Sequence, residues 1–381
     1  MNIGIFTDDY LPSVDGAVTS IITFAKEFKK LGHTVYIIAP EYPNYTDEEK
    51  NIIRLKSIPA PFPPKYRWCL SWLVNLEEKL KGIDLDIIHI QSPFPVGFLG
   101  IKEARKRKIP IVNTYHTLYP AYILSYMTFL PKWAGKIVEK YSAWACNKSD
   151  LIISPSPQMK DALVEYGVTA KIEVLPTGID LEKLLVKSDA DDFKKKYKIG
   201  SDERILLFMG RLGREKNVEF LIKALPKIIE KVPNVRLVIS GEGVAKDEIL
   251  NTAKSLGVID KVLLLGFLSH NDWINAYGAA ELFTFASLTE TQGLVLLEAM
   301  ALNTPVVAVG AMGVLDVMKN ERGGLLSKVD TNDFADKVVK ILTDKELYQR
   351  KLKEAKELAL EMSSKTMSDK LLALYEGLLK K

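Results

Sequence analysis

The stretch Glu290-Thr-Gln-Gly-Leu-Val-Leu-Leu-Glu298 places two carboxylates around Gly293. The apolar run 282–286 predicts a strand before it, and 294–302 predicts a helix that ends before Pro305. Gly293 therefore falls at the start of a helix, where unpaired backbone N–H groups form an anion site. Because acids beside that site would repel phosphate, we expect them to reach hydroxyl groups on either side of it. A nucleotide sugar, with its diphosphate between two hydroxylated rings, fits this layout.

Short apolar runs alternate with helical patterns throughout the chain, which predicts parallel sheets built from βαβ units. In the first half, the strands are expected at 2–7, 34–39, 86–90, 110–114, 151–154 and 172–176, and the helices near 17–31, 66–81, 96–107, 132–148 and 157–166. In the second half, the strands are expected at 205–209, 235–240, 262–265, 282–286 and 305–308, and the helices near 217–231, 245–256, 271–278, 294–302 and 365–379. The fold class is α/β, with two doubly wound sheets.

A charged segment, 187–198, separates the two halves and is expected to be weakly structured. We therefore expect domains over 1–180 and 181–362, with the last helix, about 363–381, able to pack back on the first domain. Doubly wound sheets bind ligands at the C-terminal ends of their strands, so the two domains are expected to share a cleft.

Composition narrows the class of protein. The chain has 381 residues, is 47% apolar and carries a net charge of +4, too weak a basic bias for a nucleic-acid partner. Two cysteines, Cys69 and Cys146, make no disulfide framework and suit a reducing compartment. No apolar run reaches the ~18 residues of a membrane span. We expect a cytoplasmic protein that can still lie on a membrane.

Two cations follow the strand expected at 205–209. Arg211 comes directly after Gly210, and Lys216 lies shortly before the next helix. Two fixed positive charges suit a diphosphate that gains charge as it leaves. The alternative is a solvated loop in which Glu215 pairs locally. Gly241-Glu-Gly243 resembles part of a dinucleotide fingerprint, and we interpret it as a loop bordering the base or the diphosphate.

Two Asp-x-Asp pairs could suggest a metal site. Asp84-Leu-Asp86 precedes a strand and so lies away from the expected cleft, while Asp189-Ala-Asp191 falls in the charged segment. Both are interpreted as solvated residues. Because Arg211 and Lys216 can neutralise a diphosphate, no metal and no other cofactor are expected.

Two of the four histidines lie near the expected cleft. His116 directly follows the strand 110–114 and should project from the sheet edge. His89 lies near the end of the strand 86–90 and could line the cleft or only support it.

Several motifs occur together: Gly210-Arg211-Leu-Gly-Arg-Glu-Lys216, the segment 290–298, Pro305-Val-Val-Ala308 and Pro12-Ser-Val-Asp-Gly16. The set resembles the retaining family 4 glycosyltransferases of the GT-B fold. That resemblance implies two Rossmann-like domains facing a central cleft, with the acceptor bound by the N-terminal domain and the nucleotide-sugar donor by the C-terminal domain.

The resemblance also implies roles for single residues. Arg211 and Lys216 would hold the donor diphosphate, Glu298 would bond the ribose, and Glu290 would approach the transferred sugar. The remaining donor contacts would come from the backbone of Gly293, Leu294 and Val295, and from Gly16. His116 and Glu290 are the catalytic candidates. Because no carboxylate is placed as a covalent nucleophile, front-face substitution is favoured, with a donor phosphate oxygen accepting the proton.

The acceptor side is marked by basic and aromatic residues. Residues 102–148 hold nine Lys and Arg, and the helix near 132–148 aligns Trp133, Ile137, Tyr141 and Trp144 beside Lys136 and Lys140. Such helices favour anionic membrane interfaces. The alternative is an ordinary core stripe with snorkelling lysines. The candidates for membrane or acceptor contact are Lys106, Arg107, Trp133, Lys136 and Lys140.

Four further segments resemble bacterial 1,2-diacylglycerol 3-glucosyltransferases: Thr7-Asp-Asp-Tyr-Leu-Pro12, Gly16-Ala-Val-Thr-Ser20, Gln91-Ser-Pro-Phe94 and Thr114-Tyr-His-Thr-Leu-Tyr119. This resemblance implies a UDP-sugar donor, diacylglycerol as acceptor, glycolipid synthesis and work at the inner face of the cell membrane. The donor hexose, glucose or galactose, stays open. So do transfer to a soluble sugar or sugar phosphate, a GT-B nucleotide-sugar epimerase and a non-catalytic nucleotide-sugar binding protein.

Overall fold

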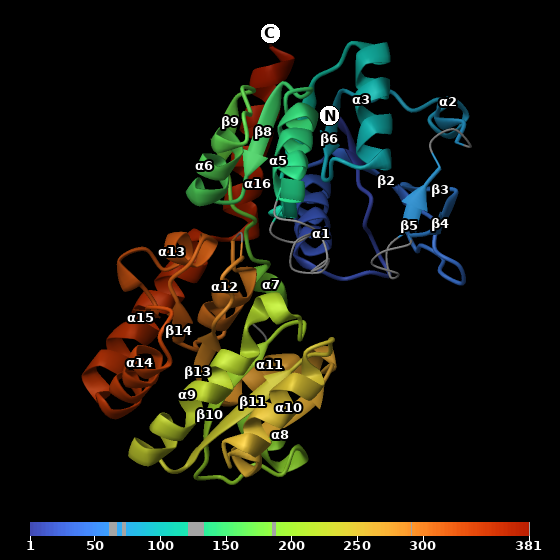
Figure 1. Cartoon of the computed structure of the whole chain (residues 1–381). Helices are drawn as coiled ribbons and strands as arrows, with labels where there is room; N and C mark the ends of the chain where they lie inside the picture. The colour runs from blue at the N-terminus through green and yellow to red at the C-terminus, as the bar shows by residue number, and fades with distance from the viewer. Residues whose placement is uncertain (61–66, 71–73, 121–132, 185–187, 291, 381) are drawn as a thin grey trace. The chain divides into compact units, whose positions relative to one another are not determined.

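The computed structural model describes residues 1–60, 67–70, 74–120, 133–184, 188–290 and 292–380 (Figure 1). The chain divides into two compact units. The first unit comprises Met1–Gly178 and Ser364–Lys381, and the second comprises Ile179–Ser363. Each unit is described by itself.

The first unit is built on a seven-stranded parallel sheet of order β3-β2-β1-β6-β7-β8-β9. Its strands are β1 (Asn2–Phe6), β2 (Thr34–Pro40), β3 (Ile52–Leu55), β6 (Ile87–Ile90), β7 (Ile111–Thr114), β8 (Leu151–Ser154) and β9 (Ile172–Val174). The strand order reverses between β1 and β6, which is the switch point where doubly wound sheets bind ligands.

The main helices of the first unit are α1 (Gly16–Lys30), α3 (Pro95–Arg107), α5 (Trp133–Cys146), α6 (Pro157–Glu165) and α16 (Ser364–Leu379), with a short α2 (Leu76–Lys79). The C-terminal helix α16 packs on α1 (Figure 1). The rings of Phe28 and Tyr375 lie 5.8 Å apart, and the hydroxyl of Ser364 donates to Glu27 over 3.2 Å. The last helix is thus part of the core of the first unit.

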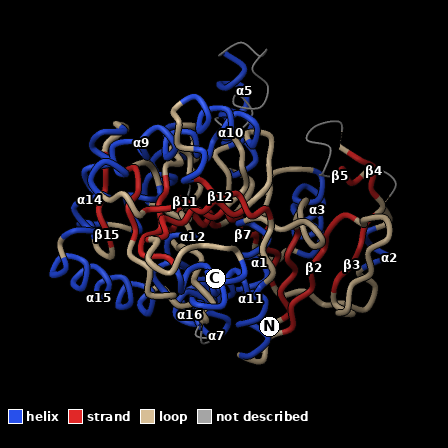
Figure 2. Tube along the Cα trace, turned by 90° about the horizontal axis from the view of Figure 1, so that it is seen from below, coloured by secondary structure: helices blue, strands red, loops and turns tan. Residues whose placement is uncertain are grey.

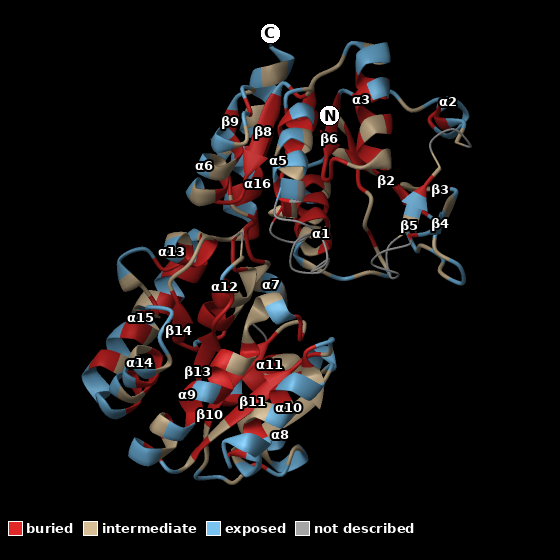
Figure 3. Ribbon diagram, viewed as in Figure 1, coloured by how far each residue is buried: buried red, intermediate tan, exposed pale blue. Residues whose placement is uncertain are grey.

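The second unit is built on a six-stranded parallel sheet of order β12-β11-β10-β13-β14-β15. Its strands are β10 (Arg204–Met209), β11 (Val235–Ser240), β12 (Val262–Gly266), β13 (Ala280–Phe285), β14 (Val306–Val309) and β15 (Gly324–Ser327). Most strand residues of both sheets are buried (Figure 3). Strands buried on both faces read as continuous apolar runs, which is why the sequence marks them clearly.

Helices cover the second sheet along its length (Figure 2). The described helices of the second unit are α7 (Leu181–Leu184), α8 (Ala190–Lys196), α9 (Val218–Lys231), α10 (Lys246–Ser255), α11 (His270–Ala279), α12 (Leu294–Ala301), α13 (Gly313–Val317), α14 (Thr331–Thr343) and α15 (Lys345–Glu361). The predicted class of two doubly wound α/β sheets is confirmed.

Two local predictions are wrong. In the helix expected near 66–81, Arg67–Cys69 forms β5, which pairs antiparallel with β4 (Ser57–Pro59), and only Leu76–Lys79 is helical. The side chain of Arg67 donates to both the hydroxyl and the carbonyl oxygen of Ser57 over 2.8 Å, so a tertiary contact overrides local helical preference. Residues 71–73 lie outside the described residues.

The charged segment between the two halves is also more ordered than expected. Asp189 caps α8 by accepting from the backbone N–H of Asp192 over 2.9 Å, and Phe193 is buried. An N-cap and one buried aromatic residue are enough to set a short helix against a core. Strands β3 and β15 and helices α14 and α15 were not predicted at all.

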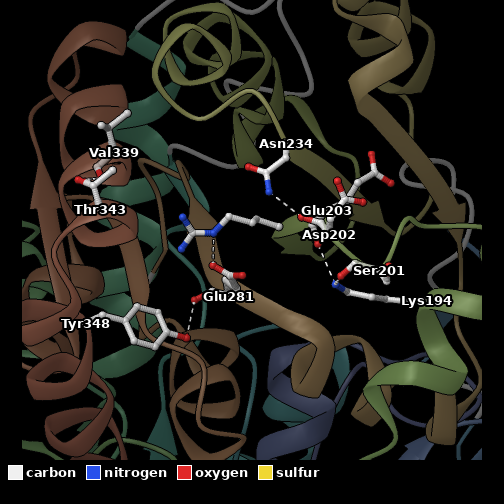
Figure 4. A network of polar contacts seen from close by, with 10 residues as sticks. Lys194, Ser201, Asp202, Glu203, Asn234, Glu281, Val339, Thr343 and Tyr348 are labelled. Atoms are coloured by element: carbon white, nitrogen blue, oxygen red, sulfur yellow. Dashed lines mark hydrogen bonds and ion pairs between the residues drawn. The ribbon is translucent and has the colours of Figure 1, made fainter.

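The N-terminal ends of the strands in the second sheet carry a network of polar contacts (Figure 4). Arg204 pairs with Glu281 over 2.5 Å, and Tyr348 donates to the carbonyl oxygen of Glu281 over 3.3 Å. Lys194 donates to the carbonyl oxygens of Ser201 and Glu203 over 3.1 and 2.8 Å. These groups satisfy one another and leave the opposite, C-terminal ends of the strands for other chemistry.

Candidate active site

Glycines bring together the loops that follow β10 and β11. A Cβ on Gly241 would lie 1.8 Å from the carbonyl oxygen of Gly210, and Gly241 itself has a φ of 141°. The backbone N–H of Leu212 donates to Glu242 over 2.9 Å, and that of Ala245 donates to Leu212 over 2.9 Å. The Gly241-Glu-Gly243 motif therefore has a backbone-packing role, since only glycine permits this approach. It holds the loop that carries Arg211.

Lys216 and Glu290 meet at the same edge of the second sheet. Lys216 ends a short 3₁₀ turn (Arg214–Lys216) after β10, and its Nζ donates to Glu290 Oε2 over 2.5 Å. The ammonium also lies 5.8 Å from the centroid of the Phe285 ring. The pair is largely shielded, with 21% and 18% of the two side chains exposed. Two motifs that are far apart in the sequence thus form one charged cluster.

Arg211 contacts Glu215, as the local alternative anticipated. Nη2 of Arg211 lies 3.0 Å from Oε1 of Glu215, whose side chain is only 9% exposed. The buried carboxylate therefore holds the guanidinium at the C-terminal ends of the strands. An arginine presents five N–H donors in a fork that matches phosphate oxygens.

The helix α12 begins at Gly293, as the sequence predicts. Gly293 is the N-cap with a φ of 75°, and no side chain caps the helix. A Cβ at this position would lie 3.1 Å from Leu296 Cδ1, in a backbone conformation that L side chains rarely adopt. The backbone N–H groups of Leu294 and Val295 belong to the first turn, which has no intrahelical acceptors. The terminus is a ready anion site beside Lys216 and Glu290.

Glu298 lies one turn along the same helix and is partly buried. Burial raises the pKa of its carboxyl from 4.5 to about 7, and no hydrogen bond within the described part of the chain opposes this shift. Burial, and to a smaller extent the charge of Glu298, raises the pKa of Tyr277, whose hydroxyl has no hydrogen-bond partner in the described structure. A desolvated carboxylate without a partner is a costly arrangement, and it is typical of binding and catalytic sites.

In the first unit, His116 follows β7 directly, as expected. Its Nε2 lies 2.6 Å from Oε1 of Gln91, which follows β6 and is 5% exposed. Burial lowers the pKa of His116 to about 4, against an opposing effect of Asp15. His116 is therefore a neutral ring at pH 7, held by an amide. The sequence analysis did not identify Gln91 as the partner of His116, although Gln91 lies at the end of the neighbouring strand.

His89 has a structural position. Its Nε2 lies 2.7 Å from the hydroxyl of Thr114, and its Nδ1 lies 2.5 Å from the hydroxyl of Tyr375 in α16. Burial lowers the pKa of His89 to about 3. Of the two interpretations left open by the sequence, the structure favours support, because one ring nitrogen contacts Thr114 in β7 and the other contacts Tyr375 in α16.

Asp8 follows β1 and was not singled out by the sequence. It accepts from the backbone N–H groups of Val96 and Gly97 over 2.9 and 3.4 Å and from the hydroxyl of Ser92 over 2.7 Å. Burial raises the pKa of Asp8 to about 6 in spite of these bonds. The Thr7-Asp-Asp motif therefore serves, at least through Asp8, to cap α3.

Comparison with known proteins identifies the family of this chain. A family model described as Glycosyltransferase Family 4 matches residues 14–183, and one described as Glycosyl transferases group 1 matches residues 189–358. An alpha-monoglucosyldiacylglycerol synthase of Streptococcus pneumoniae is 33% identical over 339 residues, 86% of this chain and 75% of that protein. The chain belongs to glycosyltransferase family 4.

Further comparisons agree with that assignment. An enzyme of the same name from Acholeplasma laidlawii is 30% identical to this glycosyltransferase over 321 residues, 81% of this chain and 80% of that protein. The crystal structure of Anabaena HepE in complex with UDP-glucose matches with a TM-score of 0.79 at 19% identity, covering 99% of this chain and 100% of that chain. The glycosyltransferase has the GT-B fold and is a retaining hexosyltransferase.

The basic residues predicted at the surface of the glycosyltransferase differ in their contacts. Arg107 is engaged inside the first unit, because it donates to Glu103 and to the carbonyl oxygen of Ile83 over 2.6 Å each. It does not support the expected membrane contact. Lys106 pairs at the surface with Glu77 over 2.8 Å. Lys136 and Lys140 are exposed on α5, and neither has a partner among the described residues.

The aromatic stripe of α5 is divided between core and surface. Trp133, Ile137 and Trp144 are 64%, 58% and 50% exposed. Tyr141 instead contacts Phe98 of α3, with ring centroids 6.2 Å apart. The stripe is therefore not the ordinary core that the alternative interpretation required.

Gly16 opens α1, whose N-cap is Asp15. A Cβ at Gly16 would meet nothing within 4 Å, so packing inside the first unit does not require glycine there. The predicted approach of this loop to the donor stays a prediction.

The Asp-x-Asp pairs of the glycosyltransferase are solvated, as interpreted. Asp84 and Asp86 are exposed at the N-terminal end of β6, and Asp189 caps α8. Among the residues that the structure describes, no group of three or more His, Cys, Asp and Glu could hold a metal ion. In the same residues, no helix is long and apolar enough to cross a membrane.

Proposed function

We propose that this glycosyltransferase moves glucose from UDP-glucose to the free hydroxyl of 1,2-diacylglycerol at an anionic membrane surface. Two relatives, named alpha-monoglucosyldiacylglycerol synthases, support the acceptor class, and HepE, solved with UDP-glucose, supports the donor class. The observation that carries the donor half is the contact of Lys216 with Glu290 at the N-terminus of α12.

The donor diphosphate is held by cations and by a helix terminus. We assign this role to Arg211 and Lys216, with the backbone N–H groups of Gly293, Leu294 and Val295. Lys216 is neutralised by Glu290 in the structure. A diphosphate would take over this cation and release Glu290 toward the hydroxyls of the transferred sugar. Glu298 takes the ribose hydroxyls, which satisfy a carboxylate that has no hydrogen bond within the described residues.

Transfer with retention is assigned to front-face substitution. The acceptor hydroxyl attacks the anomeric carbon on the face that UDP leaves, the bond from that carbon to the phosphate oxygen breaks, and a phosphate oxygen accepts the hydroxyl proton. Fixed cations stabilise the diphosphate as its charge grows. His116 is neutral, so it orients hydroxyl groups by hydrogen bonding instead of contributing positive charge.

The proposal of a lipid acceptor is supported by the exposed face of α5. Exposed tryptophan and isoleucine side chains lie on the same helix as Lys136 and Lys140, which have no partner among the described residues. Apolar side chains partition into the interfacial region of a bilayer, while nearby lysines are attracted to anionic headgroups, each by about 1 kcal/mol. A lipid acceptor could then be reached without leaving the membrane.

Labelled UDP-glucose tests the proposal directly. The enzyme is incubated with mixed anionic vesicles that contain diacylglycerol, and the lipids are then extracted. Label in the lipid phase, absent with Lys216→Ala, is the expected result. Label in the aqueous phase only, with folding verified, overturns the lipid acceptor. Transfer to an added soluble sugar or sugar phosphate would then support the alternative acceptor class.

Vesicle co-sedimentation tests the surface. The double variant Lys136→Glu/Lys140→Glu should lose most binding to anionic vesicles and keep binding of UDP. The matched control is Lys353→Glu/Lys356→Glu, which reverses two exposed charges of α15 in the second unit. Equal loss in both variants would show that general charge, and not α5, governs binding.

A further inference from the structure

A small apolar cavity lies beside the exposed face of α5 in the first unit. Its volume is about 280 Å³. The walls come from the segment before α3, from the segment after β7 and from α5, and include Pro93, Phe94, Tyr119, Ile137, Val138 and Tyr141. This volume is just below the range of about 300–1,000 Å³ typical of pockets for whole small molecules. The cavity fits a part of a ligand.

The polar groups at the walls are turned into the protein. The hydroxyl of Tyr141 donates to the carbonyl oxygen of Pro93 over 2.6 Å. The hydroxyl of Ser142 accepts from Tyr115 over 2.8 Å, and this pair is buried. Phe94 and Tyr119 stack edge to face with ring centroids 5.1 Å apart. What remains toward the cavity is hydrocarbon and aromatic surface, which favours an apolar occupant.

The cavity is continuous with the surface assigned to the membrane. Ile137 belongs to both, because it lines the cavity and is 58% exposed. Trp133 and Lys136 lie next to it on the same helix and are also exposed. A hydrocarbon chain from an anionic bilayer could therefore enter the cavity without crossing a polar surface.

One wall of the cavity lies close to His116 along the chain. Pro93 follows Gln91 by two residues, and Gln91 contacts His116 over 2.6 Å. Two residues span at most about 7 Å. A lipid with part of one chain in the cavity would thus keep its polar end near the C-terminal ends of β6 and β7, where His116 lies.

We propose that this cavity binds a stretch of one acyl chain of the lipid acceptor beyond its first few methylenes and so selects long-chain diacylglycerols. The inference rests on the proposed function, because it concerns the same acceptor. Each methylene removed from water improves affinity about fourfold. A few buried methylenes are therefore enough to separate a long-chain acceptor from a short-chain one.

Filling the cavity tests this inference. The variant Val138→Trp places a large ring on its wall, and Val164→Trp places the same ring on an exposed face of α6, where Val164 is 55% exposed. We compare kcat/KM for dioleoylglycerol and dihexanoylglycerol in mixed micelles. The wild type should prefer the long chains at least tenfold. Val138→Trp should bring that ratio close to one, while the Val164→Trp control keeps the wild-type ratio.

An unchanged ratio in Val138→Trp, with the fold verified by melting and UDP binding, overturns the acyl site. If Val138→Trp does not fold, Val138→Phe and Ile137→Trp give milder fillings of the same cavity and must also lower the ratio. The two proposals fail differently. Without any label in lipid from the wild type, the proposed function fails, whereas lipid transfer with a chain-length preference that no filling changes removes the acyl site alone.

Discussion

The two ends of the parallel strands carry polar side chains of opposite character in both sheets. At the N-terminal ends, polar groups satisfy one another, as Arg204 does with Glu281 and Asn2 with Asp86. At the C-terminal ends, burial displaces titratable groups from their usual pKa, to about 4 for His116 and about 7 for Glu298, which α12 brings to this end. Groups whose pKa is displaced by burial are candidates for ligand binding.

Energetic magnitudes support this division. An exposed ion pair such as those at the N-terminal ends contributes about 0–1 kcal/mol to stability, so these contacts refine a sheet that apolar burial already holds. A carboxylate buried without a partner lowers stability. The buried titratable groups at the C-terminal ends therefore lower the stability of the fold. Such a loss of stability is common where residues are selected for function.

The largest effect is expected at Lys216. In Lys216→Ala, the diphosphate loses one of its two fixed cations, and kcat/KM should fall about 10²–10³-fold, as for other lost transition-state donors. The matched control is Lys194→Ala at the opposite end of the sheet, which should leave turnover within about twofold. Steady-state kinetics with labelled UDP-glucose measure both. Similar losses in the two variants would remove the contrast between the two ends.

Gln91 should control the state of His116. In Gln91→Glu, a carboxylate accepts the same hydrogen bond and raises the pKa of His116 from about 4, so the ring becomes cationic at a higher pH. The acid limb of kcat should shift upward in Gln91→Glu. In Gln91→Leu, kcat should fall about 10²-fold at all pH values, at the lower end of the contribution of a positioned acid–base group.

The control for Gln91 is Thr114→Val, which removes the neighbouring contact with His89. That variant should melt at a lower temperature and keep the wild-type pH profile. If Thr114→Val shifts the acid limb as far as Gln91→Glu does, Gln91 has only a structural role.

Glu298 should show opposite effects on stability and on binding. Its pKa is about 7 in the folded chain against 4.5, so the unfolded chain ionises first and stability falls as pH rises from 4.5 to 7. Glu298→Gln should therefore raise the melting temperature at pH 8 but not at pH 4. The same variant should raise KM for UDP-glucose about tenfold at pH 8, the cost of one charged hydrogen bond. A lower melting temperature at pH 8 would contradict the assignment.

The smallest effect is expected at the N-terminal ends of the strands in the second sheet. Arg204→Ala removes an ion pair that is partly exposed, so the free energy of unfolding should change by no more than about 1 kcal/mol. For a unit of this size, that change corresponds to a shift of about 2–4 °C in melting temperature. Calorimetry gives the shift, and turnover should be unchanged. A loss of activity in Arg204→Ala would show that the N-terminal and C-terminal ends of the strands do not act independently.

Most of the fold is legible in the sequence, because fully buried strands appear as continuous apolar runs between helical patterns. The predictions fail where tertiary contacts decide the local state. Arg67–Cys69 is a strand because Arg67 bonds to Ser57, and Ala190–Lys196 is a helix because Phe193 is buried. Neither the contact of Arg67 with Ser57 nor the burial of Phe193 can be predicted from local periodicity.

The candidate site follows the same division. The sequence by itself determined the helix start at Gly293 and the positions of the two glutamates, since capping and helical spacing are local. Only the tertiary structure decided that Lys216 contacts Glu290, Gln91 contacts His116, and His89 binds Tyr375. The first two pairs depend on which strands become neighbours in a sheet, and the third depends on where α16 packs. Both are set by the packing of the whole core instead of by any short stretch of sequence.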